Sequence, residues 1–293
     1  MEPILVKDRK TGSLIKEQVF GALALKILYT RPQCCIRNFV SKNSFISKVY
    51  GWWQKQPWTK ASVNKFIKNY HIDSKEFAKN KFDSFNDFFT RELKEECRPL
   101  SYGERVAIMP ADGRYFFFQK IDEETCFNVK SSPMNLEKLL QDKELAARFK
   151  EGSMVISRLC PVDYHRFHFP CDGKASPAYP IKGPLYSVNP WALKKDPSIL
   201  WENKRVITFL ESEAFGTILY IEVGATCVGT IHQSYQTGAV VKGQEKGYFS
   251  FGGSCLILLF EKGRIAFDAD LLSSGPLEIY CQMGESLGQA PSK

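Results

Sequence analysis

The sequence predicts an α+β protein in which a helical N-terminal region precedes a mainly antiparallel, β-rich domain of sandwich-like or barrel-like form. Three observations support this prediction: apolar residues at helical spacing before residue 98, short β-branched runs after residue 108, and few helices between those runs. The 293 residues can hold one large or two small domains. We divide the chain into a helical region, residues 1–100, and a β-rich domain, residues 101–293.

Apolar residues recur near helical spacing in the first region, from residue 13 to residue 98. They include Leu14, Ile15, Val19, Leu23, Ile27, Leu28, Phe39, Phe45, Ile46 and Val49. The longest apolar stretch, Val19 to Tyr29, is interrupted by Lys26 and is far shorter than a membrane-spanning helix. We therefore expect no helix that crosses a bilayer.

Basic residues and three tryptophans lie among these apolar positions. They are Lys16, Lys26, Arg31, Arg37, Lys42, Lys48, Lys55, Lys60, Trp52, Trp53 and Trp58. A basic amphipathic segment that carries tryptophan is typical of helices lying flat on an anionic membrane, where each Lys or Arg adds about 1 kcal/mol. The alternative interpretation is that these helix faces pack on the next domain.

The overall charge and the cysteines narrow the class of protein. A net charge of +8 predicts an anionic partner, but the excess is spread along the chain, so we do not predict nucleic-acid binding. Nine cysteines without paired spacing indicate neither a disulfide framework nor a zinc site, and fit a reducing compartment. The N-terminus lacks the basic flank and apolar core of a signal peptide.

The second region reads as strands separated by Gly, Pro and Asp. The strand-like runs are residues 147–159, 204–210, 215–231 and 254–270. One convincing helix is expected, at Asn135 to Phe149. Strands at short spacing without crossover helices favour an antiparallel sandwich or barrel over a doubly wound parallel sheet.

Two of the four histidines stand three residues apart in CPVDYHRFHFP. We expect His165 and His168 to lie in a turn that runs into a strand; a helical turn opened by Pro161 is the alternative. Two imidazoles on one face could bind a metal ion. No third ligand is spaced beside them, so no metal site is predicted.

Gly252-Gly253-Ser254 stands directly before the strand-like run CLILLF, where glycines usually mark a turn or bend. Asp112, in PADGR, also has the setting of a turn residue that accepts backbone N–H bonds. With His168, Asp112 and Ser254 supply the residue types of a base-activated serine nucleophile. Any chain of this length offers many such triples, so residue types alone do not select this one.

Eight blocks of sequence support the choice of Asp112, His168 and Ser254 more specifically. They are FNDFFTREL at 85–93, RPL at 98–100, PADGR at 110–114, RLCPVDYHRFHFP at 158–170, YSVNP at 186–190, EVGATCVGTI at 222–231, EKGYFSFGGS at 245–254 and MGESLG at 283–288. In this order they resemble the bacterial-type phosphatidylserine decarboxylase proenzymes, a pyruvoyl-dependent family. The resemblance runs over most of the chain.

The resemblance implies a chain that cuts itself between Gly253 and Ser254. In the family, the serine attacks the carbonyl of the preceding glycine, and β-elimination from the resulting ester leads to a pyruvoyl group. Carried over, residues 1–253 become the β subunit, and the α subunit begins with the pyruvoyl cofactor made from Ser254. The two subunits would form a heterodimer, and the family suggests a dimer of such heterodimers.

The resemblance also assigns roles to individual residues. Asp112, His168 and Ser254 match the processing triad, with His168 as general base and Asp112 orienting it. His165 is assigned to decarboxylation, in which a Schiff base between the pyruvoyl group and phosphatidylserine loses carbon dioxide and phosphatidylethanolamine is formed. In one departure from the family, Cys255 stands where threonine is common, which predicts slower processing; Cys255 as the nucleophile is an alternative.

A phospholipid substrate favours the membrane interpretation of the helical region. We expect a protein bound peripherally to the cell membrane, at its cytoplasmic face, through the basic tryptophan-bearing segment from Val19 to Trp58. Three alternatives remain open. They are a serine hydrolase using Asp112, His168 and Ser254, although no G-x-S-x-G surrounds the serine, a non-catalytic lipid-binding protein, and a pyruvoyl decarboxylase of a soluble amine.

Overall fold

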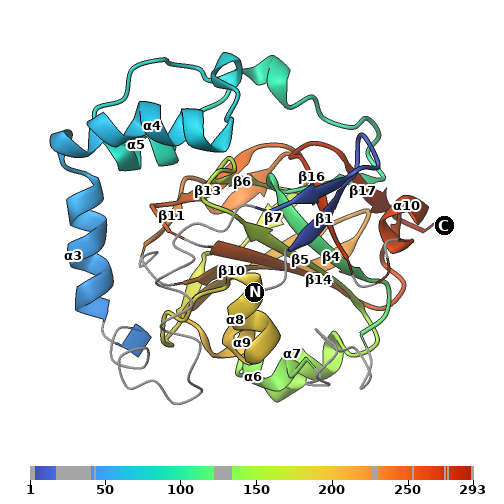
Figure 1. The fold of residues 1–293 in the computed structure, drawn as a ribbon. Helices are drawn as coiled ribbons and strands as arrows, with labels where there is room; N and C mark the ends of the chain where they lie inside the picture. Colours follow the sequence, from blue (N-terminus) through green and yellow to red (C-terminus); the bar gives the residue numbers. More distant parts are fainter. Residues whose placement is uncertain are drawn as a thin grey trace.

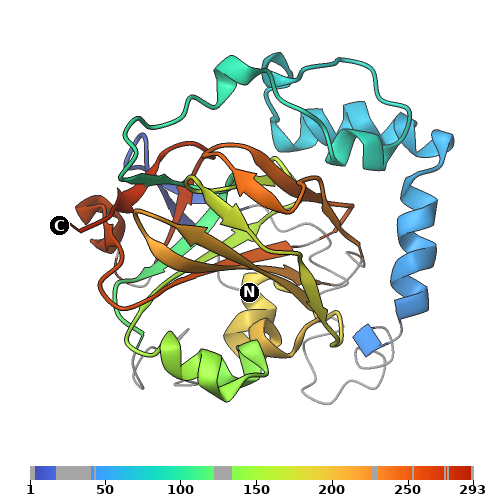
Figure 2. The same ribbon diagram turned by 180° about the vertical axis from the view of Figure 1, so that it is seen from behind.

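The computed structural model describes residues 4–17, 41–42, 44–121, 134–225, 230–252, 254–273, 275 and 277–291. A stack of β-sheets forms the centre of the molecule, and the helices of the N-terminal region lie along one side and one end of the stack (Figure 1). The view from behind shows α3, in blue, beside the sheets and the helices that follow it, in cyan and teal, above them (Figure 2). The predicted α+β class is confirmed.

The chain begins with a β-hairpin rather than a helix. Strands β1 (Leu5–Asp8) and β2 (Leu14–Lys16) pair antiparallel. The turn between them closes with a hydrogen bond from the Asp8 N–H to the Ser13 carbonyl, and Gly12 takes the positive φ of 69° that it needs. The prediction of helix at Leu14 and Ile15 is therefore wrong, because turn chemistry decides the conformation of this short apolar segment.

Several predicted helical positions lie outside the described residues. They are Val19, Leu23, Lys26, Ile27, Leu28, Arg31, Arg37 and Phe39, and with them the apolar stretch Val19 to Tyr29. Helix α3 (Ser44–Gln54) is described and includes Phe45, Ile46 and Val49, as predicted. None of the helices in the described part of the chain has the length and apolar character needed to cross a bilayer.

The remaining helices of the N-terminal region enclose a small aromatic core. They are α4 (Ala61–Tyr70), α5 (Phe85–Phe89) and the 3₁₀ turns η1 (Pro57–Lys60), η2 (Ser74–Glu76) and η3 (Glu95–Cys97). Helix α5 begins at Ser84, whose side chain caps it by accepting the Asp87 N–H. Seven buried side chains make this core: Val63, Phe66, Phe77, Phe85, Phe88, Phe89 and, from the β-rich domain, Phe251.

The β-rich domain is built on one 11-stranded sheet. Its strands in spatial order are β12 (Gly238–Val240), β7 (Gly173–Ala175), β9 (Arg205–Ser212), β10 (Gly216–Gly224), β14 (Ser254–Phe260), β5 (Ser153–Leu159), β4 (Gly113–Phe118), β16 (Glu278–Cys281), β1 and β2, with β8 (Tyr179–Ile181) also paired to β9. Neighbours pair antiparallel except β1 and β16. Its described strands form an open sheet, not a closed barrel.

Two three-stranded sheets cover one face of the large sheet, and helices cover the other. The small sheets are β11 (Ile231–Gln233), β13 (Glu245–Phe249) and β6 (Arg166–His168), and β15 (Ala266–Phe267), β17 (Ser286–Gln289) and β3 (Val106–Ile108). The helices on the other face are α6 (Leu136–Leu140), α7 (Lys143–Arg148), α8 (Pro190–Lys195) and α9 (Ile199–Glu202); α10 (Ala269–Leu272) follows β15.

Strand β14 shows how the two faces are separated. Leu256, Leu258 and Phe260 belong to the apolar core between the large and small sheets. Their neighbours Cys255, Ile257 and Leu259 belong to the core under the helices. This alternation follows from the two-residue period of a strand whose side chains are buried on both faces.

The helix predicted from Asn135 to Phe149 is two helices in the structure. Gln141 takes a left-handed conformation (φ 52°) that ends α6, and the Asp142 side chain then caps α7 by accepting the Leu145 N–H. The strand-like run predicted from residue 147 is likewise strand only from Ser153. The predicted strands at 204–210 and 215–231 correspond to β9 and to β10 with the start of β11.

Candidate active site

Ser254 opens β14 in the middle of the large sheet. It pairs with Gly224 of β10 on one side and with Leu159 of β5 on the other. Its side chain is fully buried, and its Oγ has no hydrogen-bond partner in the described part of the chain. Gly252 has a φ of 141°, which residues with a Cβ rarely adopt. Gly253, the other residue of the predicted cleavage site, lies outside the described residues.

His165 lies at the end of a turn that starts after Leu159 and leads into β6, as predicted. Its Nδ1 is 2.9 Å from the main-chain carbonyl of Asp163, which places the ring proton on Nδ1. Its Nε2 is buried and finds no partner among the described residues. Burial lowers the pKa of His165 to about 3, so the ring is neutral at pH 7.

His168 is the last residue of β6, the strand that follows the turn carrying His165. Its main-chain N–H donates to the Pro110 carbonyl at 2.8 Å, which joins β6 to the PADGR turn. The ring of Tyr164 stacks on the imidazole with 5.8 Å between centroids. The buried Nδ1 has no hydrogen-bond partner in the described structure, and burial lowers the pKa of His168 to about 4.

Two main-chain links bring Ser254 and the histidine turn side by side. Ser254 is paired with Leu159, the last residue of β5 before the turn. Five residues earlier in the chain, the Phe249 N–H donates to the His165 carbonyl at 3.0 Å. The segment from Phe249 to Ser254 and the turn from Leu159 to His165 are therefore joined at both ends.

Asp112 is brought to the same corner but has different partners from those predicted. Its carboxylate accepts hydrogen bonds from Arg98, at 2.9 Å from Nε and 2.6 Å from Nη2, and from the Met283 N–H at 2.9 Å. Glu76 holds the same guanidinium. None of the hydrogen bonds in the described part of the chain joins Asp112 to His168, although Pro110 places them on adjacent segments.

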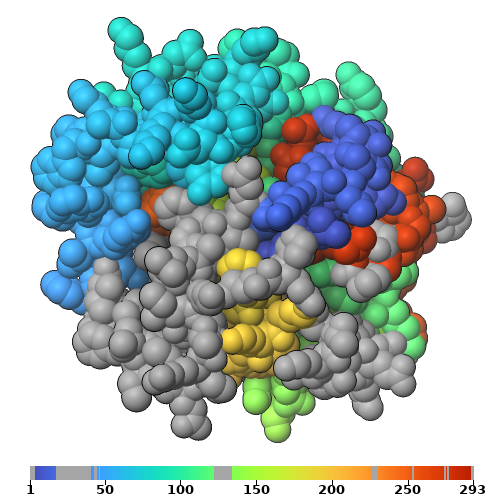
Figure 3. All heavy atoms as spheres, viewed as in Figure 1, coloured from blue at the N-terminus to red at the C-terminus, as the bar shows by residue number. Residues whose placement is uncertain are grey.

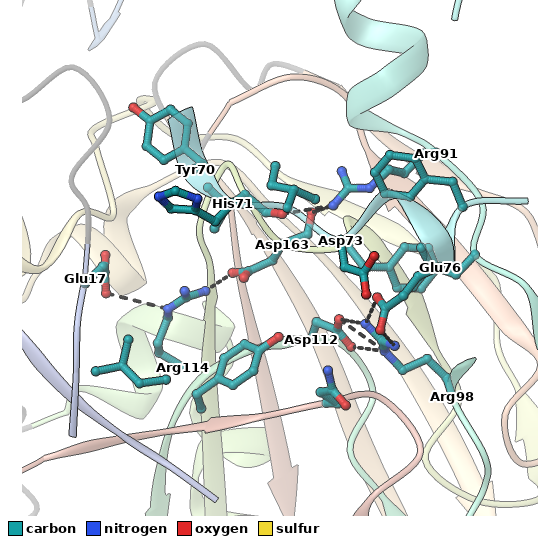
Figure 4. A pocket seen from close by; sticks show the side chains of 18 of the residues that line it. Glu17, Tyr70, His71, Asp73, Glu76, Arg91, Arg98, Asp112, Arg114 and Asp163 are labelled. Atoms are coloured by element: carbon teal, nitrogen blue, oxygen red, sulfur yellow. Dashed lines mark hydrogen bonds and ion pairs between the residues drawn. The ribbon is translucent and has the colours of Figure 1, made fainter. Parts of the chain in front are cut away.

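A cavity of about 390 Å³ opens beside Asp112. It lies between the turn after α4, the N-terminal hairpin and the large sheet (Figure 4). Arg114 points into it between Asp163, with which it forms an ion pair, and Glu17, 3.7 Å from the Arg114 Nε (Figure 4). Asp163 also accepts the Cys160 N–H at 2.6 Å. These contacts fix the turn that carries His165.

Helix α5 and the residues after it cover the site. The Phe89 ring lies 3.8 Å from the His165 ring, centroid to centroid. The Asn86 side-chain oxygen accepts the Phe251 N–H at 3.0 Å, next to Gly252. Arg91 donates to the carbonyls of Val162 and Asp163 at 2.9 and 3.1 Å. Helix α5 therefore covers the turn before Ser254.

These covering residues were not predicted as site residues. Asn86, Phe89 and Arg91 stand in FNDFFTREL, and Arg98 stands in RPL. Both blocks carried the family resemblance, which was therefore the available signal. Nothing in their local spacing indicates that they lie on the histidine turn, because that contact depends on the tertiary fold.

Cys255 lies on the opposite face of β14 from Ser254. It is fully buried in the core under the helices, with Ile257 and Leu259. Burial raises the pKa of its thiol, so the thiolate is not available as a nucleophile. The alternative that Cys255 attacks the scissile bond has no support in this geometry.

The described residues contain no group of three or more His, Cys, Asp or Glu side chains placed to hold a metal ion. The polar groups of the site are instead bound to one another or left without partners.

Comparison with known proteins agrees with the sequence blocks. A family model described as phosphatidylserine decarboxylase matches residues 85–289. A relative from Chlamydia muridarum, named phosphatidylserine decarboxylase proenzyme, is 45% identical over 98% of both chains. Relatives with the same name from Chlamydia felis and Chlamydia trachomatis serovar D are 44% identical over 99% of both chains, and 42% identical over 98% of this chain and 97% of theirs.

Proposed function

Because the chain belongs to the phosphatidylserine decarboxylase family, we propose that it is a self-processing proenzyme that converts phosphatidylserine to phosphatidylethanolamine and carbon dioxide. One structural observation supports the proposal in addition to the family membership. Three polar atoms, Ser254 Oγ, His165 Nε2 and His168 Nδ1, are buried without partners in the described structure. Each such atom costs about 1–3 kcal/mol, a cost that a site of proton transfer explains.

The first reaction is cleavage before Ser254. The Ser254 Oγ attacks the carbonyl carbon of Gly253, the peptide C–N bond breaks, and an ester to Oγ forms. Elimination breaks the bond between Cβ and Oγ and releases the carboxylate of residue 253. The dehydroalanine left at position 254 takes up water and loses ammonia to become pyruvoyl. The positive φ of Gly252 supports an unusual backbone at this turn.

His168 takes the hydroxyl proton of Ser254 in this step. With a pKa of about 4 the imidazole is neutral at pH 7 and can accept a proton. Asp112 then acts on the imidazolium by its charge, since its own hydrogen bonds hold it to Arg98 and Met283. This role needs no direct hydrogen bond between Asp112 and His168, and it favours the charged ring.

The site fits a pyruvoyl group at position 254, because the serine from which it forms is buried on a segment joined to the histidine turn, and both Ser254 Oγ and His165 Nε2 are buried without partners in the described structure. When present, a pyruvoyl group supplies a ketone that binds the substrate amine and takes up the electron pair left by carbon dioxide. His165 holds its proton on Nδ1 through the Asp163 carbonyl. Its Nε2 is therefore the atom that exchanges a proton at the reacting carbon.

The N-terminal helices bring this site to a membrane surface. Large apolar side chains in and after α3 are exposed to solvent: Phe45 by 68%, Trp52 by 57%, Trp53 by 50% and Trp58 by 55%. Trp58 contacts both other tryptophans, so these rings form one patch. Lys48, Lys55 and Lys60 lie in the same segment. Such a patch suits peripheral binding to an anionic bilayer at the cytoplasmic face.

Two experiments test the proposal, one for cleavage of the chain and one for decarboxylation of phosphatidylserine. A denaturing gel with mass spectrometry is expected to show two fragments, the shorter starting at position 254 with a ketone in place of the amine. Release of labelled carbon dioxide from phosphatidylserine tests the substrate. A single intact chain that hydrolyses esters would establish the serine hydrolase instead, and an intact inactive chain the lipid-binding protein. Release from a soluble amino acid alone would assign a soluble substrate.

A further inference from the structure

The N-terminal hairpin, residues 5–17, is attached mainly to the end of the chain. Strand β1 pairs in parallel with β16, with Val6 opposite Glu278 and Asp8 opposite Tyr280. The space-filling view shows the hairpin, in dark blue, lying over the red C-terminal residues (Figure 3). Without β1, strand β16 would be an edge strand of the large sheet, with main-chain groups exposed.

Arg9, in the hairpin turn, adds side-chain contacts to two further parts of the C-terminal segment. Its guanidinium lies 2.9 Å from an Asp268 carboxylate oxygen and 2.7 Å from one of Asp270. It also donates to the main-chain carbonyl of Ser286. The side chain is only 15% exposed, so these ion pairs are shielded from water more than most surface pairs.

Glu17, at the other end of the hairpin, joins a buried ionic bridge. It accepts from the Arg158 Nη2 at 2.9 Å, and Arg158 donates to both carboxylate oxygens of Glu278 at 2.6 Å. The nearby arginines Arg158 and Arg114 lower the pKa of Glu17 despite the opposing effect of its burial. Removing one member of a buried ionic bridge leaves an uncompensated charge, so the bridge resists separation of its parts.

The contacts of β1 with β16, and of Arg9 with Asp268, Asp270 and Ser286, join the larger product of cleavage before Ser254 to the smaller product. We propose that the N-terminal hairpin is a second attachment that helps to retain the C-terminal fragment, residues 254–293, after the chain is cut, in addition to the pairing of β14 with β5 and β10. This inference rests on the proposed function, since an uncut chain holds the fragment covalently. Retention keeps position 254 between β5 and β10, beside His165.

The test measures how firmly the cut protein holds its short fragment. Purified cut protein is incubated in graded urea and separated by gel filtration, and the co-eluting fragment is quantified on denaturing gels. Arg9→Ala is expected to lower the retained fraction at least threefold at a urea concentration where wild type retains most of it. Lys79→Ala, which removes an ion pair with Asp87 inside the larger fragment, is the matched control and leaves retention unchanged.

Two comparisons make the result decisive. In an uncut Ser254→Ala background, Arg9→Ala is expected to leave the protein folded at the urea concentration that releases the fragment from the cut variant. Arg9→Lys, which keeps a positive charge beside Asp268 and Asp270, is expected to retain more of the fragment than Arg9→Ala. Complete cleavage with equal retention in Arg9→Ala and wild type overturns this inference alone. A wild-type chain that remains in one piece overturns the proposed cleavage itself.

Discussion

In the described part of the chain, the β-rich domain buries polar atoms that lack hydrogen-bond partners, whereas the N-terminal helices expose large apolar side chains to solvent. Around Ser254, polar atoms are buried without a hydrogen-bond partner in the described structure. Around Trp58, large apolar rings are left in water. Both arrangements cost folding free energy, the first through lost hydrogen bonds and the second through forgone apolar burial.

The buried site is suited to the reaction, and the exposed patch is suited to reaching the substrate. Neutral imidazoles and a buried hydroxyl on joined segments suit proton transfer, while exposed tryptophans in a segment with lysines suit contact with a lipid surface. Helix α5 links the two, because Phe89 packs on His165 within the aromatic core of the helical region. The exposed tryptophans and the buried polar atoms nevertheless belong to different residues, so a substitution of either set should leave the property of the other set intact.

The largest effect is expected at the buried hydroxyl. Ser254→Ala should abolish cleavage and decarboxylation, leaving one inactive chain on a denaturing gel. Because the Oγ it removes is already without a partner, the free energy of unfolding should stay constant or rise by up to about 1 kcal/mol. Urea unfolding checks this, and vesicle binding should be unchanged. Two fragments from the variant would remove Ser254 from its role.

The buried histidines should make stability depend on pH. Their pKa values in the folded chain are about 3 and 4, against about 6.5 when unfolded, so between pH 6.5 and 4 the unfolded chain binds more protons. The contribution of the two neutral histidines to the free energy of unfolding is complete above pH 6.5. It is lost as the pH falls, by roughly 1 kcal/mol per histidine per pH unit.

Urea unfolding of the uncut Ser254→Ala chain at pH 7, 6 and 5 measures this loss. The same chain carrying His165→Asn and His168→Asn is the control, because all other titrating groups are shared. The control should lose roughly 2 kcal/mol less between pH 6 and pH 5. Equal losses in the two chains would show that the histidines titrate normally.

A smaller effect is expected at the exposed rings. Replacing Trp52, Trp53 and Trp58 by Ser should weaken binding to phosphatidylserine vesicles at least tenfold, or about 1.4 kcal/mol, without preventing cleavage. Higher salt should weaken the binding of wild type further. Tyr102→Ser is the matched control, since Tyr102 is 96% exposed outside the patch. Vesicle co-sedimentation measures both, and equal binding by all three proteins would contradict the docking role.

The sequence predicts the α+β class and the strands β9, β10 and β14 because their patterns are long and locally determined. It fails at Leu14 and Ile15, because two apolar residues fit helix and strand equally and pairing with β1 decides. It also fails at Gln141, where a single left-handed residue divides a helix that its apolar pattern predicts as continuous.

The sequence indicates which residues to consider as site residues, but it does not predict their geometry. His165, His168 and Ser254 were named from motifs, and the structure places them on neighbouring segments. The hydrogen bonding of Asp112 to Arg98, and the packing of Phe89 on His165, depend on segments far apart in sequence. No local pattern encodes such contacts, so only the folded chain reveals them.

The smallest effect is expected at Cys255, where the sequence predicted slower processing than with threonine. The side chain faces the apolar core under the helices, away from Ser254, so it cannot orient the ester. Cys255→Thr should leave the cleavage rate within about twofold, or about 0.4 kcal/mol of barrier. Its hydroxyl in that core should lower the free energy of unfolding by about 1 kcal/mol.

Pulse-labelled synthesis followed by gels gives the cleavage rate, and urea unfolding of the uncut background gives stability. Cys255→Val, which fills the same space without a hydroxyl, separates the two effects and should match wild type in cleavage. Cleavage that accelerates many-fold with threonine but not with valine would mean that the hydroxyl reaches the scissile bond. Residue 255 would then have to turn toward Ser254, against the alternation of β14.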